Sequence, residues 1–175
     1  MKADNFILTG FMGSGKSTIG KKLANAFGYT FLDTDELLEK QFGKTIREVF
    51  ENEGEEYFRT CETELLNNLI TTCKGAVIST GGGMPMRDEN VALLKKLGTV
   101  VYLDVKIETI LDRLKNDTKR PLLQGSEFEQ KTRMLYEQRL PKYRSSADFC
   151  LVTEEKSFYR IIKEADEIRK HTMAQ

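Results

Sequence analysis

The sequence has little histidine and little cysteine, and this scarcity narrows the chemistry that it can support. It holds one histidine, His171, and three scattered cysteines, Cys61, Cys73 and Cys150, with no C-x-x-C pair. An odd number of dispersed cysteines excludes a disulfide or zinc framework and is typical of a reducing compartment. We expect each cysteine to be a small core or half-buried residue. A single histidine in a polar tail disfavours histidine-based acid–base catalysis.

An excess of charge of either sign is also absent. The chain has 27 Lys+Arg and 27 Asp+Glu residues, so its formal net charge is zero. Such a balanced chain has no electrostatic attraction to nucleic acid or to an anionic membrane. No apolar run is long enough to span a bilayer, and the first residues do not lead into the apolar core of a signal peptide. We therefore expect a cytoplasmic protein that binds neither nucleic acid nor membrane.

Apolar runs alternate with longer segments of helical periodicity. The short runs predict five strands, at Phe6–Thr9, Thr30–Asp33, Ala76–Ser79, Val100–Leu103 and Phe149–Val152. The longer segments predict eight helices, at Lys16–Phe27, Asp35–Phe42, Ile46–Glu53, Glu55–Thr72, Asp88–Leu97, Ile107–Lys115, Glu127–Arg144 and Ser157–Lys170. This alternation predicts an α/β fold, a three-layer α/β/α sandwich around a five-stranded parallel sheet. Because there is no internal repeat or Pro/Gly-rich linker, we expect one domain over residues 1–175.

The most informative motif is Gly10-Phe11-Met12-Gly13-Ser14-Gly15-Lys16-Ser17, which matches the phosphate-binding pattern G-x-x-x-x-G-K-[ST] at every position. A predicted strand precedes it and a predicted helix follows, in the order that makes an anion cradle. Glycines allow backbone N–H groups to face phosphate oxygens, while Lys16 can reach the β and γ phosphates and Ser17 can ligate Mg²⁺. The motif therefore predicts a nucleoside triphosphate site; the alternative is a glycine turn that merely joins a strand to a helix.

Paired aspartates follow the second predicted strand, as Asp33-Thr34-Asp35. Ligands bind at the carboxyl ends of the strands in parallel sheets of this kind. The third predicted strand has no acid at its end, so Asp33 is the candidate carboxylate for Mg²⁺. Asp35 could then orient an acceptor hydroxyl and accept its proton. The alternative is that one or both aspartates only cap the next helix.

Three successive glycines follow the third predicted strand, in Thr80-Gly81-Gly82-Gly83. They expose backbone N–H groups and allow a ligand to lie directly against the chain. The alternative is a flexible turn into the helix that begins near Asp88. With the P-loop and the two aspartates, three strand ends on one edge of the sheet carry unusual chemistry.

Arginines are the candidates for binding an anionic acceptor, because a guanidinium group matches a carboxylate in a bidentate fork. Arg59, early in one predicted helix, and Arg139, near the end of another, could both reach the pocket. Their spacing alone does not separate them from Arg87, Arg133 or Arg144. Any one of these could instead be a solvated surface arginine.

The segment Lys119–Ser126 lies between two predicted helices and contains a proline, a glycine and a pair of leucines. This composition suits a loop that closes over a ligand. Arg120 on such a loop could neutralise the charge of a transferring phosphoryl group. An ordinary connection between helices is the alternative that the composition leaves open.

Taken together, these motifs resemble the shikimate kinase family, which consists of small P-loop kinases of the nucleoside-monophosphate-kinase type. The family pattern is G-x-x-G-x-G-K-S, D-[ST]-D, E-x-x-F-R, T-G-G-G, R-P-L-L and R-x-P-x-Y. The matching segments, in the same order, are Gly10–Ser17, Asp33–Asp35, Glu55–Arg59, Thr80–Gly83, Arg120–Leu123 and Arg139–Tyr143. One departure is Met84-Pro85-Met86, where a smaller Ala-Val-like step is expected; it concerns the packing beneath the substrate and touches none of the motif residues.

The resemblance implies a P-loop kinase fold with a mobile lid at about residues 117–126 and a substrate-binding helical region at about residues 34–60. It implies transfer of the γ-phosphoryl group of ATP to the 3-hydroxyl of shikimate, which forms ADP and shikimate 3-phosphate in the pathway to chorismate and the aromatic amino acids. Mg²⁺ is the implied cofactor, ATP and shikimate are the implied small-molecule partners, and a monomer is the expected state by analogy.

The resemblance also implies a role for each matched residue. The nucleotide would be bound by Gly13, Ser14, Gly15, Lys16, Ser17, Thr18, Arg113 and Arg120, with the loop Thr153–Lys156 also near adenine. Shikimate would be bound by Asp35, Arg59, Gly81, Gly82 and Arg139, and Mg²⁺ by Ser17 and, through water, Asp33. Lys16, Asp35 and Arg120 would be catalytic, with Asp35 as the base.

Two other readings of the P-loop remain. In the first, the chain is another small-molecule kinase, such as a gluconate or nucleotide kinase. Gluconate would also need carboxylate-binding arginines. The set Asp35, Arg59, Gly82 and Arg139 favours shikimate. A nucleotide-dependent switch is the other, but the sequence contains no N-K-x-D-type motif for reading guanine.

Overall fold

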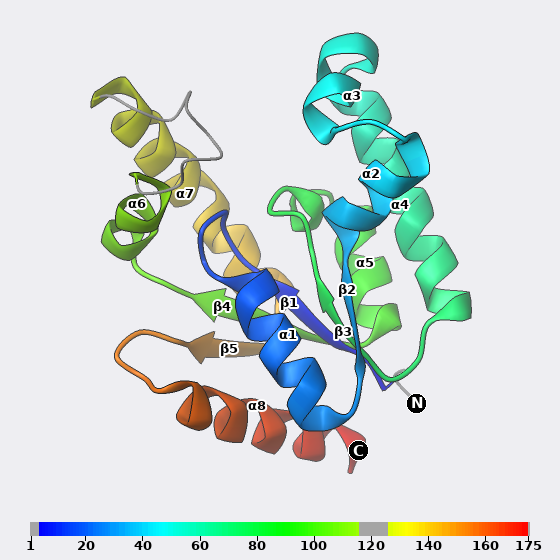
Figure 1. Cartoon of the computed structure of the whole chain (residues 1–175), viewed down its shortest axis with the longest axis vertical. Helices are drawn as coiled ribbons and strands as arrows, with labels where there is room; N and C mark the ends of the chain where they lie inside the picture. Colours follow the sequence, from blue (N-terminus) through cyan, green and yellow to red (C-terminus); the bar gives the residue numbers. More distant parts are fainter. Residues whose placement is uncertain (1–3, 116–125, 175) are drawn as a thin grey trace.

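A computed structural model describes residues 4–115 and 126–174 of the chain (Figure 1). Its five strands form one sheet in the order β2-β3-β1-β4-β5, and every neighbouring pair is parallel. The strands are β1 (Phe6–Thr9), β2 (Thr30–Asp33), β3 (Ala76–Ser79), β4 (Thr99–Asp104) and β5 (Phe149–Val152). The predicted five-stranded parallel sheet is therefore confirmed, and β4 extends one residue further than expected at each end.

Every predicted helix is present within the described residues. The helices are α1 (Lys16–Phe27), α2 (Thr34–Phe42), α3 (Ile46–Glu53), α4 (Glu55–Thr72), α5 (Asp88–Leu97), α6 (Ile107–Lys115), α7 (Ser126–Ser146) and α8 (Phe158–Met173). A 3₁₀ turn that the sequence did not predict, η1 (Met84–Met86), follows the glycine triplet. The predicted lid at residues 117–126, including Arg120, lies outside the described residues except for Ser126, where α7 begins.

Alternate residues of the strands pack against different helices, which gives the fold three layers (Figure 1). On one face of the sheet, Phe6 and Leu8 of β1 belong to a core cluster with Leu23 of α1 and Ile161 of α8. On the other face, Ile7 belongs to a second cluster with residues of α4 and α5, including Leu66, Leu69 and Leu94. This alternation is what a parallel sheet buried on both faces requires.

Two groups of helices extend beyond the carboxyl ends of the strands, α2 and α3 on one side and α6 and α7 on the other (Figure 1). The first group packs on the first turns of α4 through a small core of Leu38, Val49, Phe58 and Cys61. A capping box between Thr45 and Glu48 begins α3, so this short helix starts at a defined residue. The functional edge of the sheet therefore lies between two helical groups that pack separately.

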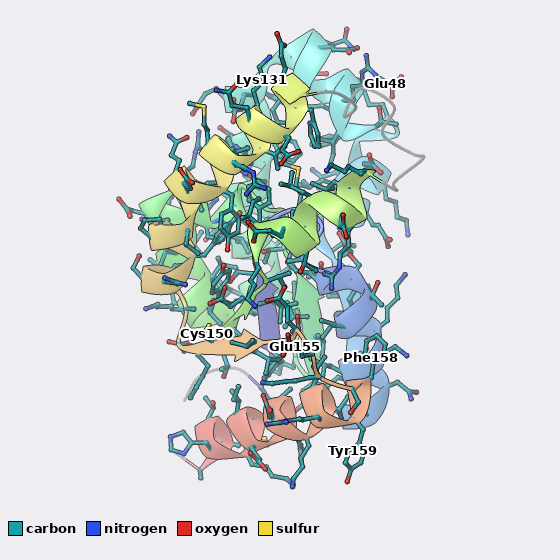
Figure 2. The ribbon with its side chains drawn as sticks, turned by 90° about the vertical axis from the view of Figure 1, so that its left-hand side faces the viewer. Glu48, Lys131, Cys150, Glu155, Phe158 and Tyr159 are labelled. Carbon is teal, nitrogen blue, oxygen red and sulfur yellow. The ribbon has the colours of Figure 1, made fainter. Side chains whose placement is uncertain are left out.

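Two residues differ from the sequence-based expectation, Cys150 in its exposure and His171 in the element to which it belongs. Cys61 is buried and Cys73 half-buried, as expected, but Cys150 is exposed, because its side chain points outward from the edge strand β5 (Figure 2). His171 is exposed as expected, yet it belongs to α8 rather than to an irregular tail, and its ring meets Phe149 edge-on at 6.1 Å. Among the helices of the described residues, none has the length and apolar character that crossing a bilayer requires.

Candidate active site

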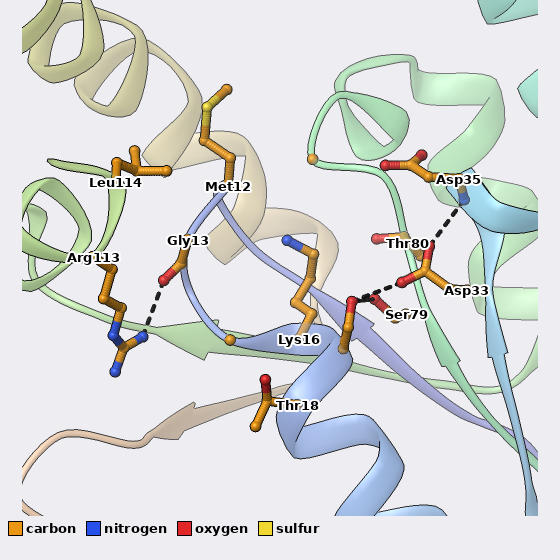
Figure 3. A pocket seen from close by; sticks show the side chains of 13 residues that line it. Met12, Gly13, Lys16, Thr18, Asp33, Asp35, Ser79, Thr80, Arg113 and Leu114 are labelled. Carbon is orange, nitrogen blue, oxygen red and sulfur yellow. Dashed lines mark hydrogen bonds between the residues drawn. The ribbon is translucent and has the colours of Figure 1, made fainter. Parts of the chain in front are cut away.

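Three neighbouring strands carry the predicted chemistry to one edge of the sheet. The order β2-β3-β1 places Asp33–Asp35, Thr80–Gly83 and the P-loop at three adjacent strand ends. A cavity of about 370 Å³ opens there (Figure 3). Its lining residues are Met12, Gly13, Gly15, Lys16, Ser17, Thr18, Asp33, Asp35, Ser79, Thr80, Gly82, Arg113 and Leu114. The coincidence of motifs expected at this edge is therefore present in three dimensions.

The P-loop wraps around the start of α1. Gly15 caps this helix with φ of 91°, a left-handed conformation that glycine adopts at little cost. The Lys16 ammonium donates hydrogen bonds to the carbonyl oxygens of Gly10 at 2.8 Å and Phe11 at 3.0 Å, so it lies over the loop. The first N–H groups of α1 and the positive end of its dipole face the same space, and this arrangement suits a polyphosphate.

Asp33 connects the P-loop to the acceptor side through its two carboxylate oxygens. Oδ1 accepts a hydrogen bond from the Asp35 N–H at 3.1 Å and caps α2, while Oδ2 accepts one from the Ser17 hydroxyl at 2.7 Å (Figure 3). The capping interpretation is thus correct for Asp33 but does not exhaust its role. Asp35 is the second residue of α2 and lines the cavity rather than capping the helix.

The donor set at Ser17 and Asp33 fits Mg²⁺. A hydroxyl and a carboxylate are hard oxygen ligands, and Mg²⁺ is usually held by one or two such groups together with water and substrate phosphates. Within residues 4–115 and 126–174, no group of three or more His, Cys, Asp or Glu side chains is arranged to hold a metal by itself. A divalent ion here would depend on phosphate and water oxygens for the rest of its coordination.

The glycine triplet packs against charged side chains from α2 and α4. A Cβ atom built on Gly83 would lie 2.5 Å from both terminal nitrogens of Arg59, so only glycine allows the guanidinium to approach this closely. The Gly81 N–H donates to the Thr34 hydroxyl at 2.9 Å, which ties the triplet to the start of α2. Met84, which follows the triplet, is fully buried in the core, so the unusual Met-Pro-Met segment packs beneath the site.

Arg59 is fixed by two carboxylates. Its Nη1 donates to Glu62 at 2.7 Å and its Nη2 to Glu55 at 3.0 Å. The other arginines that spacing could not exclude form ion pairs with partners elsewhere: Arg87 with Glu56, Arg133 with Glu108 and Glu129, and Arg144 with Asp104. The structure therefore separates Arg59, which contacts the glycine triplet, from these three.

Arg139 reaches the same region from α7. Tyr143 lies one turn later in the same helix; burial raises its pKa to about 12, and the nearby charges of Arg139 and Arg59 oppose that rise. The Tyr143 hydroxyl in turn donates to the carbonyl oxygen of Gly82 at 2.6 Å. Two arginines from different helices therefore converge on the glycine triplet.

A second cavity, of about 320 Å³, continues from the P-loop toward α8. Its lining residues are Gly15, Thr18, Ile19, Arg113, Thr153, Lys156, Phe158 and Ile161. Arg113 lines both cavities and donates to the Gly13 carbonyl oxygen at 3.0 Å (Figure 3). The segment Thr153–Lys156, which we expect near adenine, thus borders a cavity next to the P-loop.

Comparison with known proteins gives the family. The sequence model of shikimate kinase matches residues 12–169. Curated shikimate kinases from Persephonella marina and Thermodesulfovibrio yellowstonii are each 44% identical to this chain, over 91% and 94% of it and 95% and 96% of their own lengths. This chain belongs to the shikimate kinase family. Its activity is accordingly the ATP-dependent transfer of a phosphoryl group to a hydroxyl of shikimate.

Solved structures of the family agree in fold. A shikimate kinase from Acinetobacter baumannii in complex with shikimate superposes with a TM-score of 0.83 at 40% identity, covering 99% of this chain and 94% of that one. One from Aquifex aeolicus gives 0.80 at 37% identity, covering 97% and 98%. A gluconokinase from Sinorhizobium meliloti reaches only 0.61 at 16% identity and shares the fold alone. The predicted family and P-loop kinase fold are confirmed, and the gluconate alternative is the weaker one.

Within this shikimate kinase fold, most of the predicted nucleotide and metal residues line the cavities. Ser14 differs: its side chain is 1% exposed beneath the loop, and its hydroxyl has no hydrogen-bond partner among the described residues. The position of Arg120 cannot be compared, because it lies outside those residues. On the acceptor side, Asp35 and Gly82 line the first cavity, and Arg59 and Gly81 lie next to them.

Sequence reasoning missed Glu62, a fully buried acid beside Asp35. One of its oxygens accepts from Arg59, and the other, Oε1, has no hydrogen-bond partner among the described residues. Burial raises the pKa of Glu62 above its usual range; Arg59 opposes the rise and the charge of Asp35 adds to it. A signal was available, because Glu62 falls on the stripe of Phe58, Leu66 and Leu69, which face the core.

Proposed function

We propose that the chain transfers the γ-phosphoryl group of ATP to the 3-hydroxyl of shikimate, with ATP in the two joined cavities and shikimate against the glycine triplet. The observation that carries this proposal is the order of three strand ends, which sets an anion-binding loop and a carboxylate pair beside Arg59 and the triplet. The product, shikimate 3-phosphate, is an intermediate on the path to chorismate and the aromatic amino acids.

On the nucleotide side, the amides of Gly13, Ser14, Gly15 and Thr18 and the ammonium of Lys16 would hold the phosphates. The support is the geometry of the loop. The Lys16 ammonium binds the carbonyl oxygen of Gly10, just after β1, and lies beside the start of α1. Arg113 and the turn Thr153–Lys156 would border the adenine, because they line the cavity that continues from the loop.

Mg²⁺ is proposed as the cofactor, held by the Ser17 hydroxyl and, through water, by Asp33. The support is the donor set of hard oxygens 2.7 Å apart beside the P-loop. When bound, the ion neutralises charge on the phosphates. The role of the chain is to aim these two oxygens into the cavity, which the capping contact of Asp33 with α2 does.

On the acceptor side, Arg59 and Arg139 would bind the shikimate carboxylate, and Gly81 and Gly82 would lie against its ring. Asp35 would orient the reacting hydroxyl and accept its proton as the hydroxyl oxygen bonds to the γ-phosphorus. The bond from that phosphorus to the bridging oxygen of ADP then breaks. Lys16, together with Arg120 closing from the lid, would stabilise the charge that moves onto ADP.

The test is ADP formation from ATP and Mg²⁺ with shikimate, gluconate, nucleoside monophosphates or no acceptor. We expect release that depends on shikimate and on Mg²⁺, and phosphorus NMR of the product should place the phosphate on the 3-hydroxyl. Release that ignores every acceptor would remove the acceptor assignment and leave only the P-loop reading.

We also propose that the chain acts as a monomer in the cytoplasm. The support is that residues of one chain build both sides of the site, and that its three cysteines are free thiols, as in a reducing compartment. Light scattering should give a mass near 20.0 kDa; twice that mass would contradict the monomer.

A further inference from the structure

One buried tyrosine contacts both parts of the acceptor side. Tyr143 of α7 is 0% exposed, and its hydroxyl donates to the carbonyl oxygen of Gly82 at 2.6 Å. Gly82 itself lines the first cavity and lies against the P-loop, since a Cβ atom built on it would be 3.5 Å from the Gly10 carbonyl oxygen and 3.6 Å from the Met12 nitrogen. The hydroxyl therefore fixes a glycine that lies between the nucleotide loop and α7.

The same hydroxyl lies near Arg139. The two residues are four apart, one turn, in α7, and the charge of Arg139 opposes the rise in the pKa of Tyr143 that burial causes. Because the proton of the Tyr143 hydroxyl goes to Gly82, the tyrosine oxygen keeps its lone pairs for a donor, and a guanidinium can only donate. Tyr143 thus lies between Arg139 and the backbone of the triplet.

The helix between the two side chains is weakened, which increases the need for such a contact. Pro141 lies inside α7. A proline there removes one backbone hydrogen bond of the helix and disturbs the turn before it. Arg139 sits in that turn, so a contact to a fully buried residue restricts where its guanidinium can lie.

A second tyrosine provides an internal comparison. The rings of Tyr143 and Tyr102 are stacked, with centroids 5.4 Å apart and planes 6° from parallel. Tyr102 is 1% exposed, but its hydroxyl points to Asp104 at 3.5 Å, and Asp104 lines neither cavity. The two rings share one core, and only one hydroxyl is directed at the acceptor side.

We propose that Tyr143 is a positioning residue for the acceptor, because its buried hydroxyl fixes the Gly82 carbonyl beside Arg139. This inference rests on the proposed roles of Arg139 and Gly82 in binding shikimate. Removing the hydroxyl leaves the stacked ring in place but releases the Gly82 carbonyl and removes a polar neighbour of Arg139, so shikimate binding weakens while the nucleotide side is retained.

The experiment compares Tyr143→Phe with the matched variant Tyr102→Phe in steady-state kinetics. For Tyr143→Phe we expect the KM for shikimate to rise about tenfold, as befits the loss of one buried hydrogen bond that leaves a carbonyl without its donor. Its KM for ATP and its kcat should stay within about twofold of the parent protein. Tyr102→Phe should leave both KM values within about twofold. Thermal unfolding of both variants sets an assay temperature at which each is folded.

A double-mutant cycle with Arg139→Ala distinguishes positioning from a general structural effect. In the Arg139→Ala background, removal of the Tyr143 hydroxyl should raise the KM for shikimate less than it does in the parent. Equal effects of Tyr143→Phe and Tyr102→Phe, an equal rise for both substrates, or full additivity with Arg139→Ala would each overturn the inference. If Arg139→Ala itself leaves the KM for shikimate unchanged, the proposed acceptor site fails first.

Discussion

The two halves of the active site are built in different ways. The proposed phosphate-binding groups of the nucleotide half come from one continuous stretch, Gly10–Thr18, and are mostly backbone amides at the start of α1. The acceptor half is assembled from side chains on α2, α4 and α7 around the glycine triplet. Backbone groups are fixed by the local fold, whereas side chains need partners that hold them, which for Arg59 are Glu62 and Glu55.

This difference teaches where each half is vulnerable. A substitution impairs the nucleotide half when it removes a charged side chain or changes the loop itself. Damage to the acceptor half can come from residues that touch no substrate, because the arginines depend on buried neighbours. The predictions below test this contrast, beginning with the largest effect.

Replacement of Lys16 by alanine should reduce kcat by about three orders of magnitude, because it removes an ammonium over the P-loop that can stabilise the charge developing on the leaving phosphate. Measurement of ADP release at saturating shikimate provides the check. Lys21→Ala is the control: Lys21 is an exposed residue of the same helix whose ammonium lies 5.5 Å from the centroid of the Phe31 ring. Normal turnover of Lys16→Ala would sink the P-loop assignment.

Replacement of Arg139 by alanine should raise the KM for shikimate by about ten- to a hundredfold and spare the KM for ATP, since a charge-assisted hydrogen bond is worth about 1.5–3 kcal/mol. Arg144→Ala, on the same helix but paired with Asp104, should change neither constant beyond about twofold. An equal loss for both substrates would move Arg139 to the nucleotide half.

Glu62→Gln tests the carboxylate that binds Arg59 in the acceptor half, through the pH dependence of the free energy of unfolding. Burial raises the folded-state pKa of Glu62, so the native protein binds this proton more tightly than the unfolded chain does. Its contribution to stability is complete below the unfolded pKa and is lost as the pH rises through the folded pKa. Glutamine does not titrate, so the free energy of unfolding of Glu62→Gln should increase relative to the parent across that window.

Urea denaturation of both proteins at a series of pH values from about 4 upward measures this difference. Glu64→Gln, an exposed change on the same helix, is the control and should show no such trend. A stability difference between Glu62→Gln and the parent that stays flat, or falls as the pH rises, would contradict the raised pKa.

Ser14→Ala should have the smallest effect, with kcat/KM for ATP within about threefold of the parent. The hydroxyl is buried and has no hydrogen-bond partner in the described part of the chain, and the substitution retains the amide. Ser17→Ala, which removes a proposed Mg²⁺ ligand three residues later, should lose about a hundredfold. If Ser14→Ala is as damaging as Ser17→Ala, the nucleotide half depends on side chains more than we propose.

Much of the fold was predictable because its signals are local. The strand β1 and the helix α1 match the predicted bounds, since an apolar run, a glycine loop and a helical pattern follow one another directly. The extension of β4 to Asp104 was missed, because the edge of a strand depends on its neighbours and Asp104 pairs with Val152 of β5. The turn at Met84–Met86 was missed because proline and methionine give no periodic signal over three residues.

The acceptor half was only partly predictable from the residues themselves. Spacing could not separate Arg59 from Arg87, since both are simply arginines near predicted helix ends. What separates them is distance in the folded chain, where Arg59 contacts the glycine triplet and Arg87 pairs with Glu56. The sequence indicates Tyr143 only as part of a motif, because its partner Gly82 is 61 residues away.

The parallel pairing of β1 has a consequence for how the chain is made. Residue Phe6 pairs with Val77 of β3 on one side and with Thr99 of β4 on the other, so β1 has both of its neighbours only after α5 has been synthesised. A ribosome-bound chain thus has its P-loop early. The strand before the loop, β1, cannot pair on both sides until more than half of the 175 residues have emerged. Binding of cellular ATP can therefore stabilise this strand only late in synthesis. Until then, its apolar residues depend on the factors that protect nascent chains from aggregation.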